Sequence, residues 1–386
     1  MLHLVWERRC RLIVSIAVII SVAIVLVVPY FAEHNAISWA KDLGAEIGLS
    51  GTWPFEHLFS VSFRGTNLAE SDLARLNACP RLAFLDLFGS HVSDVGLASL
   101  TPRDSLGDIN LGRTRITDSG LLHLQQFRGL EGVSVRETGV TDEGVQAIAA
   151  LPRLQGVDLA GTGVTDVGLV ALSQIPTLGM LNIDNTNVGG DAAAFEGFSA
   201  LYSLSVRDTQ LNDEAFRNVI ARSTDLRELF ADATKVSDHA FVKLTGSSRL
   251  ESLSLSKTIV SDSCLEWLVG SCANLERLAL DDTKISDAGV ARLPQLTRLK
   301  SISLSRTDIS DKCMTSLLQC PNLETLVLDS TLITDDGILQ LASAKNLLYL
   351  YVGNTSVTDL AAQLLKDRIP SLTIIKAANQ KDRHNP

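Results

Sequence analysis

Hydrophobic and polar residues follow a pattern that repeats about every 24 residues from Leu58 onward. Eight residues before each repeat's marker stands a leucine, and two residues after it stands an aliphatic residue. The marker is a threonine, replaced once by serine, and its thirteen occurrences are Thr66, Ser90, Thr114, Thr138, Thr162, Thr186, Thr209, Thr234, Thr258, Thr283, Thr307, Thr331 and Thr355. Such a constant register predicts a chain of similar, stacked coils.

Each repeat predicts a strand, a turn and a short helix. Apolar residues alternate with polar ones before the marker, as in Leu-Ser-Leu at residues 253–255, which is typical of a strand with one buried face. The Ser/Thr-Asp pair after the marker, such as Thr117-Asp118, can accept hydrogen bonds from the free N–H groups that open a helix. Leu169 and Leu172 illustrate the helical spacing of the apolar residues that follow. We therefore expect an α/β solenoid of about thirteen coils over residues 58–378, with a concave parallel sheet and short convex helices.

Two motifs carry a resemblance to a known family. C-P-x-L begins the repeats at residues 79–82 and 320–323, and I-[TS]-D-x-G-[LI] stands at residues 116–121 and 333–338. The pattern resembles the leucine-rich repeat (LRR) superfamily, most closely its cysteine-containing, ribonuclease-inhibitor-like branch, although threonine here replaces the cysteine usual at the marker. The resemblance implies a protein-binding arc, and it leaves the partner open because LRR folds serve many partners.

A different pattern occupies the start of the chain. Residues 12–31 are uncharged and long enough to cross a bilayer as a helix, and Arg8, Arg9 and Arg11 precede them. We expect a single-pass transmembrane anchor, with residues 1–11 in the cytoplasm and the repeats exported to the periplasm or the cell exterior. A cleaved signal peptide and a buried soluble helix are the alternatives. With such an anchor, the chain resembles membrane-anchored bacterial LRR proteins.

Both ends of the solenoid need covers. Residues 32–57 are predicted to form an N-terminal cap, with Ile37, Ala40, Leu43 and Ile47 at helical spacing. Residues 379–386 are polar and predicted to be a disordered tail.

Composition and charge narrow the function. The net charge of -10 argues against binding nucleic acid. The mean hydropathy of +0.19 comes mostly from residues 12–31. Six cysteines are too few for a disulfide scaffold, and those outside the anchor are expected to be buried free thiols.

The sequence holds no legible catalytic or metal-binding motif. The aspartate that recurs near each helix start lacks the close spacing of a calcium loop, so helix capping is the favoured interpretation. The histidines are scattered over different repeat positions, and no nucleophile–base or phosphate-binding motif occurs. We therefore expect no enzyme activity, no cofactor and no metal.

The concave face offers the candidate binding residues, at positions six, four and two before each marker (positions −6, −4 and −2). Most of these are small or polar, whereas aromatic residues stand near both ends and acidic ones recur at position −2 in the second half. Arginine holds position −2 at Arg64, Arg136 and Arg207. The candidate partner-binding residues are Phe84, Asp86, Phe88, Phe230, Asp232, Asp281, Asp329, Tyr349 and Tyr351.

The predicted function is a non-catalytic, membrane-anchored LRR scaffold that binds a protein through its exported concave face. The alternative is a cell-envelope structural protein that binds polysaccharide or peptidoglycan, because concave aromatic rings can stack on sugars. A glycosylation sequon at Asn354 matters only in an organism that glycosylates.

Overall fold

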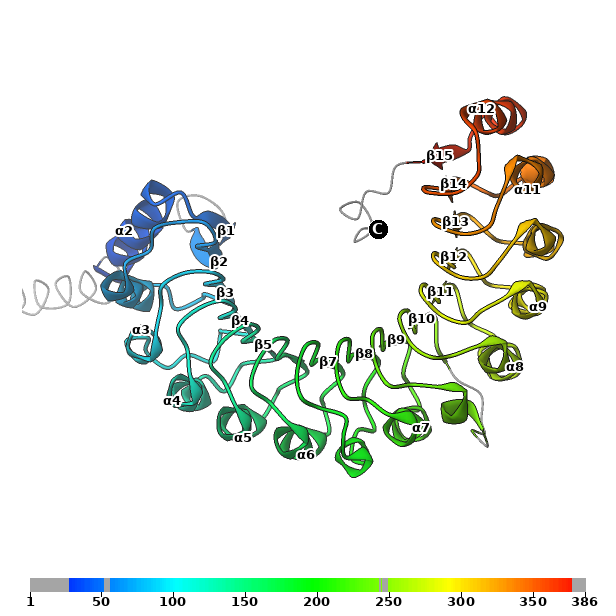
Figure 1. Ribbon diagram of the computed structural model, residues 1–386. Coiled ribbons are helices and arrows are strands. Elements are labelled where there is room, and N and C mark those ends of the chain that lie inside the picture. Colours follow the sequence, from blue (N-terminus) through cyan, green and yellow to red (C-terminus); the bar gives the residue numbers. More distant parts are fainter. Residues whose placement is uncertain (1–27, 52–55, 243, 245–248, 377–386) are drawn as a thin grey trace, which may run out of the picture. The chain divides into compact units, whose positions relative to one another are not determined.

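The chain forms two compact units in a computed structural model that describes residues 28–51, 56–242, 244 and 249–376. The first unit holds the described residues up to Val140 together with 150–154, and the second holds Thr141–Ala149 and the described residues from Gln155 onward. Within each unit the strands follow one another in sequence order on the concave side, and short helices line the convex side (Figure 1). The predicted order of strand, turn and helix in each coil is confirmed.

In the first unit, helix α2 packs beside the first strands, and the later strands alternate with short α-helices or 3-10 helices (η). The elements are α2 (Val28–Asp42), β1 (Glu46–Ser50), β2 (His57–Ser62), η2 (Glu70–Ala78), β3 (Phe84–Asp86), α3 (Asp94–Ala98), β4 (Asp108–Asn110), α4 (Asp118–Leu122), η3 (His123–Gln126) and β5 (Gly132–Ser134).

The second unit repeats the same alternation. Its elements are α5 (Asp142–Ala149), β6 (Gly156–Asp158), α6 (Asp166–Ser173), β7 (Met180–Asn182), η4 (Ala192–Phe195), β8 (Ser203–Ser205), α7 (Asp213–Arg222), β9 (Glu228–Phe230), η5 (Asp238–Phe241), β10 (Ser252–Ser254), α8 (Asp262–Ser271), β11 (Arg277–Ala279), α9 (Asp287–Val290), η6 (Leu293–Gln295), β12 (Ser301–Ser303), η7 (Asp311–Cys313), α10 (Met314–Leu318), β13 (Thr325–Val327), α11 (Asp335–Gln340), η8 (Leu341–Ser343), β14 (Tyr349–Tyr351), α12 (Asp359–Arg368) and β15 (Thr373–Ile375).

The aliphatic residues of the repeat form the core between the sheet and the helices. Equivalent residues of adjacent coils lie side by side, as where parallel pairing of β10 with β11 sets Leu253 opposite Leu278. Both of these leucines and Leu255 are buried. Removing such stacked side chains from water is the main stabilising contribution of each coil.

A left-handed residue turns the chain after each strand from β2 to β14. The residue just before each of the thirteen markers has φ between 54° and 72°. Glycine supplies it at Gly65, Gly89 and Gly161, but the others are residues with side chains, such as Arg113, Ala233 and Lys257. The left-handed conformation costs an L-residue about 1–2 kcal/mol, so the fold must hold these residues in place.

The marker threonine helps to stabilise the left-handed turn that precedes it. In all twelve threonine-marked coils the Oγ1 hydroxyl donates to the carbonyl oxygen three residues earlier, as Thr209 does to Val206 at 2.6 Å. The bond closes the turn from inside the coil. Ser90 is the exception, because its buried hydroxyl has no partner.

The N-terminal cap differs from its prediction. Helix α2 ends at Asp42, because Gly44 adopts φ 78° and its N–H binds the Lys41 carbonyl at 2.8 Å. The prediction that this helix continues through Ile47 is therefore wrong. Ile47 lies instead in β1, which pairs antiparallel with β2, whereas the strands from β2 onward within each unit pair in parallel.

The predicted transmembrane helix over residues 12–31 is also wrong for the part of the segment that the structure describes. Within the described ranges, no helix has both the length and the apolar composition to cross a bilayer. Helix α2 shares Val28–Phe31 with the predicted span, but it carries Glu33, Lys41 and Asp42 beyond it. Residues 1–27 lie outside the described residues, as does the predicted disordered tail, residues 379–386. The exported location of the repeats depends on residues 12–27 and stays a prediction.

Candidate functional site

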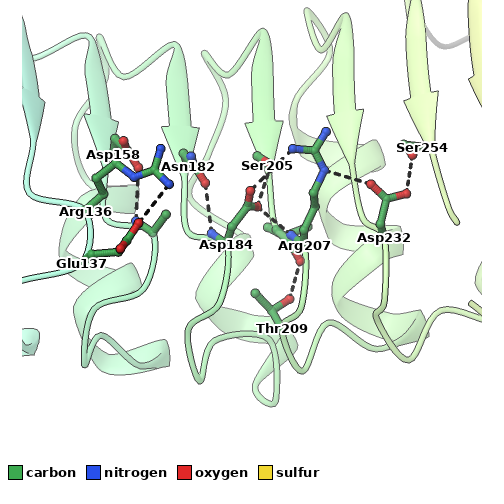
Figure 2. Close-up of polar contacts among 12 residues, drawn as sticks. Arg136, Glu137, Asp158, Asn182, Asp184, Ser205, Arg207, Thr209, Asp232 and Ser254 are labelled. Carbon is green, nitrogen blue, oxygen red and sulfur yellow. Dashed lines mark hydrogen bonds and ion pairs between the residues drawn. The ribbon is translucent and has the colours of Figure 1, made fainter. Parts of the chain in front are cut away.

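The candidate site is the exposed face of the sheet in each unit. Residues at positions −5 and −3 point into the core, so those at −6, −4 and −2 face outward. Figure 2 shows part of this face, with side chains of adjacent coils forming short polar chains across the strands. These contacts decide which of the predicted residues stay available to a partner.

Phe84 is a large apolar side chain exposed near the start of the first unit. It stands at position −6 on β3 with 40% of its surface exposed, and the parallel register sets it between Ser60 on β2 and Asp108 on β4. Burial and the nearby Glu131 carboxylate raise the pKa of Asp108 above its ordinary value.

Phe88 is half-buried, at position −2 of the same coil, and arginines surround it. The Arg64 guanidinium lies 4.3 Å from its ring centre and that of Arg113 lies 5.5 Å away. Gly112 leaves room for this arrangement, because a Cβ there would lie 2.8 Å from the ring and 2.7 Å from Cγ of Arg136. The ring is thus packed among cationic side chains.

Asp86 is part of the framework between these two aromatic residues. It is only 7% exposed and accepts hydrogen bonds from the Ser62 hydroxyl at 2.9 Å and the Phe88 N–H at 3.0 Å. Asn110 accepts in the same way from the Gly112 N–H at 3.0 Å. In these coils the side chain at position −4 therefore binds the amide at position −2.

The acidic residues at position −2 of the second unit bind a different group. Each accepts from the amide at position −2 of the following coil, and where that coil has serine at −4, from the serine hydroxyl as well. Asp281 accepts from the Ser305 N–H at 2.6 Å and the Ser303 hydroxyl at 2.5 Å. Asp184 and Asp232 do the same with their neighbours, as Figure 2 shows. These carboxylates tie one coil to the next.

Asp329 also accepts from the position −2 amide of the following coil, but that coil has no serine at position −4. Its carboxylate accepts from the Gly353 N–H at 2.5 Å, and the residue is only 2% exposed; Tyr351 stands at the position of the serine in the next coil. The predicted acidic stripe is thus a row of inter-coil contacts, and any role of Asp232, Asp281 and Asp329 in binding a partner stays a prediction.

Phe230 lies under an ion-paired arginine. The guanidinium of Arg207 is 4.4 Å from the ring centre, and it pairs with Asp232 at 2.9 Å and with Asp184 at 3.6 Å (Figure 2). Two carboxylates thus share this one cation. Tyr349 differs, since 45% of its surface is exposed on β14, beside the exposed Leu348 and the partly exposed Tyr351.

The recurring aspartate on the helix side forms a second inter-coil ladder. Asp94 accepts from the backbone N–H of Thr117 at 2.9 Å and from its hydroxyl at 2.6 Å, and the same pair of bonds links Asp311 to Thr334. The glycine of the I-[TS]-D-x-G motif makes room, because a side chain on Gly120 or Gly337 would collide with these carboxylates. The aspartate therefore serves the helix of the next coil, while serine or threonine caps its own helix, as Thr165 does.

The described side chains form no site for metal chemistry. Among the described residues, no group of three or more His, Cys, Asp or Glu side chains is arranged to hold a metal ion. The described cysteines Cys79, Cys264, Cys272, Cys313 and Cys320 are buried and free, as predicted. Burial raises the pKa of the Cys79 and Cys313 thiols to about 12 and that of Cys320 to about 11.

The part that Arg113 and Gly112 play around Phe88 was not predicted from the sequence. The signal was present in the period, because residues one repeat apart lie side by side. Position −2 runs Arg64, Phe88, Gly112 and Arg136 through the first unit, so a large ring beside a glycine and two arginines could be predicted to stack.

Comparisons with known proteins agree on the fold. Residues 269–372 match the family model described as the LRR repeats of the FBD-associated F-box protein At5g56370. No curated protein sequence matches the chain.

Solved structures extend the likeness beyond that segment. An internalin from Listeria monocytogenes is similar with a TM-score of 0.62 and 22% identity over 83% of this chain and 87% of its own. A chain of the yeast Rad7–Elc1 complex has a TM-score of 0.53 and 19% identity over 96% and 98%. A chain of the mouse RP105/MD-1 complex has a TM-score of 0.54 and 17% identity over 80% and 57%.

The repeat motif, the stacked coils and these likenesses agree on one fold. At such identities the likeness to solved structures is one of fold. The chain is similar to leucine-rich repeat proteins, and a family model supports that likeness over residues 269–372.

Proposed function

We propose that this protein is a binding scaffold that holds a protein partner on the concave face of its sheets. The observation that carries the proposal is the exposure of Phe84 and Tyr349 on a face where most side chains are small or polar. Apolar rings left in water on a rigid surface are typical anchors of protein interfaces.

The position of these rings supports the proposal. Both stand at position −6 of a strand whose adjacent residues at −5 are buried, so the sheet fixes their direction. A ring on a rigid strand loses little conformational entropy when a partner covers it. The similar chains of the Rad7–Elc1 and RP105/MD-1 structures are themselves parts of protein complexes, which is consistent with such a role.

Capture of a partner by the full-length chain tests the proposal. Two variants, Phe84→Ala and Tyr349→Ala combined with Tyr351→Ala, remove the exposed rings of each unit separately. The matched control replaces Val95, Val167 and Leu332, exposed apolar residues outside the strands, with alanine. We expect the wild type and the control to retain one partner that at least one concave variant loses, with unchanged thermal unfolding.

Asp281 and Asp329 are unsuitable for this test, because their carboxylates bind backbone amides and their loss would weaken the sheet. Capture that is equal for the wild type and both concave variants would contradict the proposal. Binding of purified polysaccharide that depends on the same rings would instead favour a carbohydrate ligand.

A further inference from the structure

The first unit carries three arginines at or near the ring of Phe88, namely Arg64, Arg113 and Arg136, and we name these four residues the Phe88 cluster. The guanidinium groups of Arg64 and Arg113 lie 4.3 and 5.5 Å from the ring centre, and the ring and the stem of Arg136 both lie within 3 Å of the place that a Cβ on Gly112 would take. A guanidinium that stacks on an aromatic ring keeps its edge N–H groups free to bind an anion.

The charges within the cluster do not cancel. Glu137 pairs with both Arg113, at 2.6 Å, and Arg136, at 3.2 Å. Arg64 lies 3.7 Å from Asp86, whose oxygens already accept from Ser62 and Phe88, and 60% of the Arg64 side chain is exposed. The cluster is thus a cationic surface in a chain of net charge -10.

We propose that the Phe88 cluster and Phe84 together bind an acidic segment of the partner protein. This inference rests on the proposed scaffold function and names the surface and the chemistry of its partner. A carboxylate of that segment accepts two parallel hydrogen bonds from the Arg64 fork, which the ring holds in orientation. An apolar side chain of the same segment covers Phe84.

The spacing of the two anchors defines the segment further. Phe84 stands four residues before Phe88 in the same coil, a span of about 13 Å in extended chain. Asp108 lies beside Phe84 in the register, so the strand-start end of this surface is acidic and the turn end is cationic. An extended segment that fits has an apolar residue and an acidic residue about four positions apart.

A protein segment fits this surface better than a nucleic acid does. Single-stranded nucleic acid also uses stacking rings and arginines, but it needs a cationic path along its whole backbone. Here Asp108 and Glu131 stand exposed at the other end of the strands. The surface therefore favours a peptide ligand, and binding of nucleic acid is one outcome that the test can distinguish.

The test is selection of a random twelve-residue peptide library on phage against the full chain, followed by fluorescence anisotropy with the enriched peptide. We expect peptides with glutamate or aspartate three to five positions from an aromatic or aliphatic residue. Arg64→Gln should weaken binding about tenfold, Arg64→Lys less, and Phe88→Leu about threefold. The matched control, Arg227→Gln, removes an equally exposed arginine of the second unit and should leave affinity unchanged.

Enrichment of neutral or basic peptides, or of none, would overturn the proposal, as would acidic peptides indifferent to Arg64→Gln. A labelled oligothymidylate bound more tightly, with the same dependence on Arg64, would replace it with a nucleic-acid site. The peptide results can fail while Phe84→Ala, or Tyr349→Ala combined with Tyr351→Ala, still loses the captured partner. In that case the scaffold function stands and only the assignment of the Phe88 cluster as the binding surface is wrong.

Discussion

The two units satisfy the same backbone amide in different ways. In the first unit, Asp86 and Asn110 at position −4 bind the position −2 amide of their own coil. Four aspartates at position −2 of the second unit instead bind the equivalent amide of the following coil, as Asp281 does for Ser305. At the start of that unit, Asp158 and Asn182 still bind the position −2 amide of their own coils.

The difference determines which side chains are free for function. Where position −4 supplies the acceptor, position −2 can hold any residue, and Phe88 and Arg64 occupy it in the first unit. Where position −2 supplies the acceptor, its carboxylate is committed to the next coil. Acidic residues of the same face therefore differ in availability, although the sequence makes them look alike.

The helix-side ladder is common to both units, so breaking it should have the largest effect. We expect Gly337→Ala in the second unit and Gly120→Ala in the first each to lower the free energy of unfolding by about 3 kcal/mol, because the new methyl group displaces the Asp311 or Asp94 carboxylate. Urea denaturation measures both.

The control for that pair is Gly270→Ala in α8, where a Cβ meets nothing within 4 Å. It should be neutral or stabilising by up to about 1 kcal/mol. A loss confined to one unit would show that the ladder matters to that unit alone.

The position −2 aspartates offer the sharpest contrast between the units. Asp281→Ala leaves the Ser305 amide and the Ser303 hydroxyl without an acceptor and should cost about 2 kcal/mol in urea denaturation. Asp281→Asn keeps the accepting oxygen and should cost less than about 1 kcal/mol. Asn110→Ala, which frees one amide in the first unit, should cost about 1 kcal/mol. Equal losses from Asp281→Ala and Asp281→Asn would contradict the assigned contact.

The buried thiols should make the second unit the more sensitive to alkaline pH. Burial raises the pKa of Cys320 to about 11 from an ordinary 9.0, so the folded state keeps the proton that the unfolded state loses. This contribution is complete below pH 9 and is lost as the pH rises toward 11. Between pH 8 and 10 the wild type should lose about 1 kcal/mol more stability than Cys320→Ala.

Pulsed thiol labelling separates the units, because Cys79 reports on the first and the other four described cysteines on the second. Labelling of Cys79 before Cys320 during an alkaline titration would reverse the expected order.

The smallest effects concern the marker. Thr209→Val removes the hydroxyl bond to Val206 but keeps the shape, and should cost about 1 kcal/mol. Ser90→Ala removes a buried hydroxyl that has no partner, and should be neutral or slightly stabilising. Thermal unfolding compares the two, and a loss at Ser90 as large as that at Thr209 would show that its hydroxyl has a role.

The local elements were predictable from the sequence because each follows from a pattern within one repeat. Leucine spacing predicts the strands, and Ser/Thr-Asp predicts the helix starts. The roles of Asp281 and Asp94 were not predictable in this way, because their hydrogen-bond partners lie one coil away. Ile47 was assigned to a helix from its spacing alone, whereas Gly44 in the left-handed conformation ends that helix before it.

The helix-side ladder gives the solenoid a direction. The carboxylates of this ladder reach forward to the next coil, as Glu70 binds Ser93 and Asp335 binds Thr358, and the ladder is interrupted where Gly190 replaces the aspartate. Removal of a coil from either end would expose the apolar face of the next coil. Removal from the C-terminal side would also return one carboxylate of the ladder to water, whereas removal from the N-terminal side would strip the new first coil of the acceptor for its helix-opening amides. The ladder therefore makes the two ends differ in the polar contacts that shortening breaks.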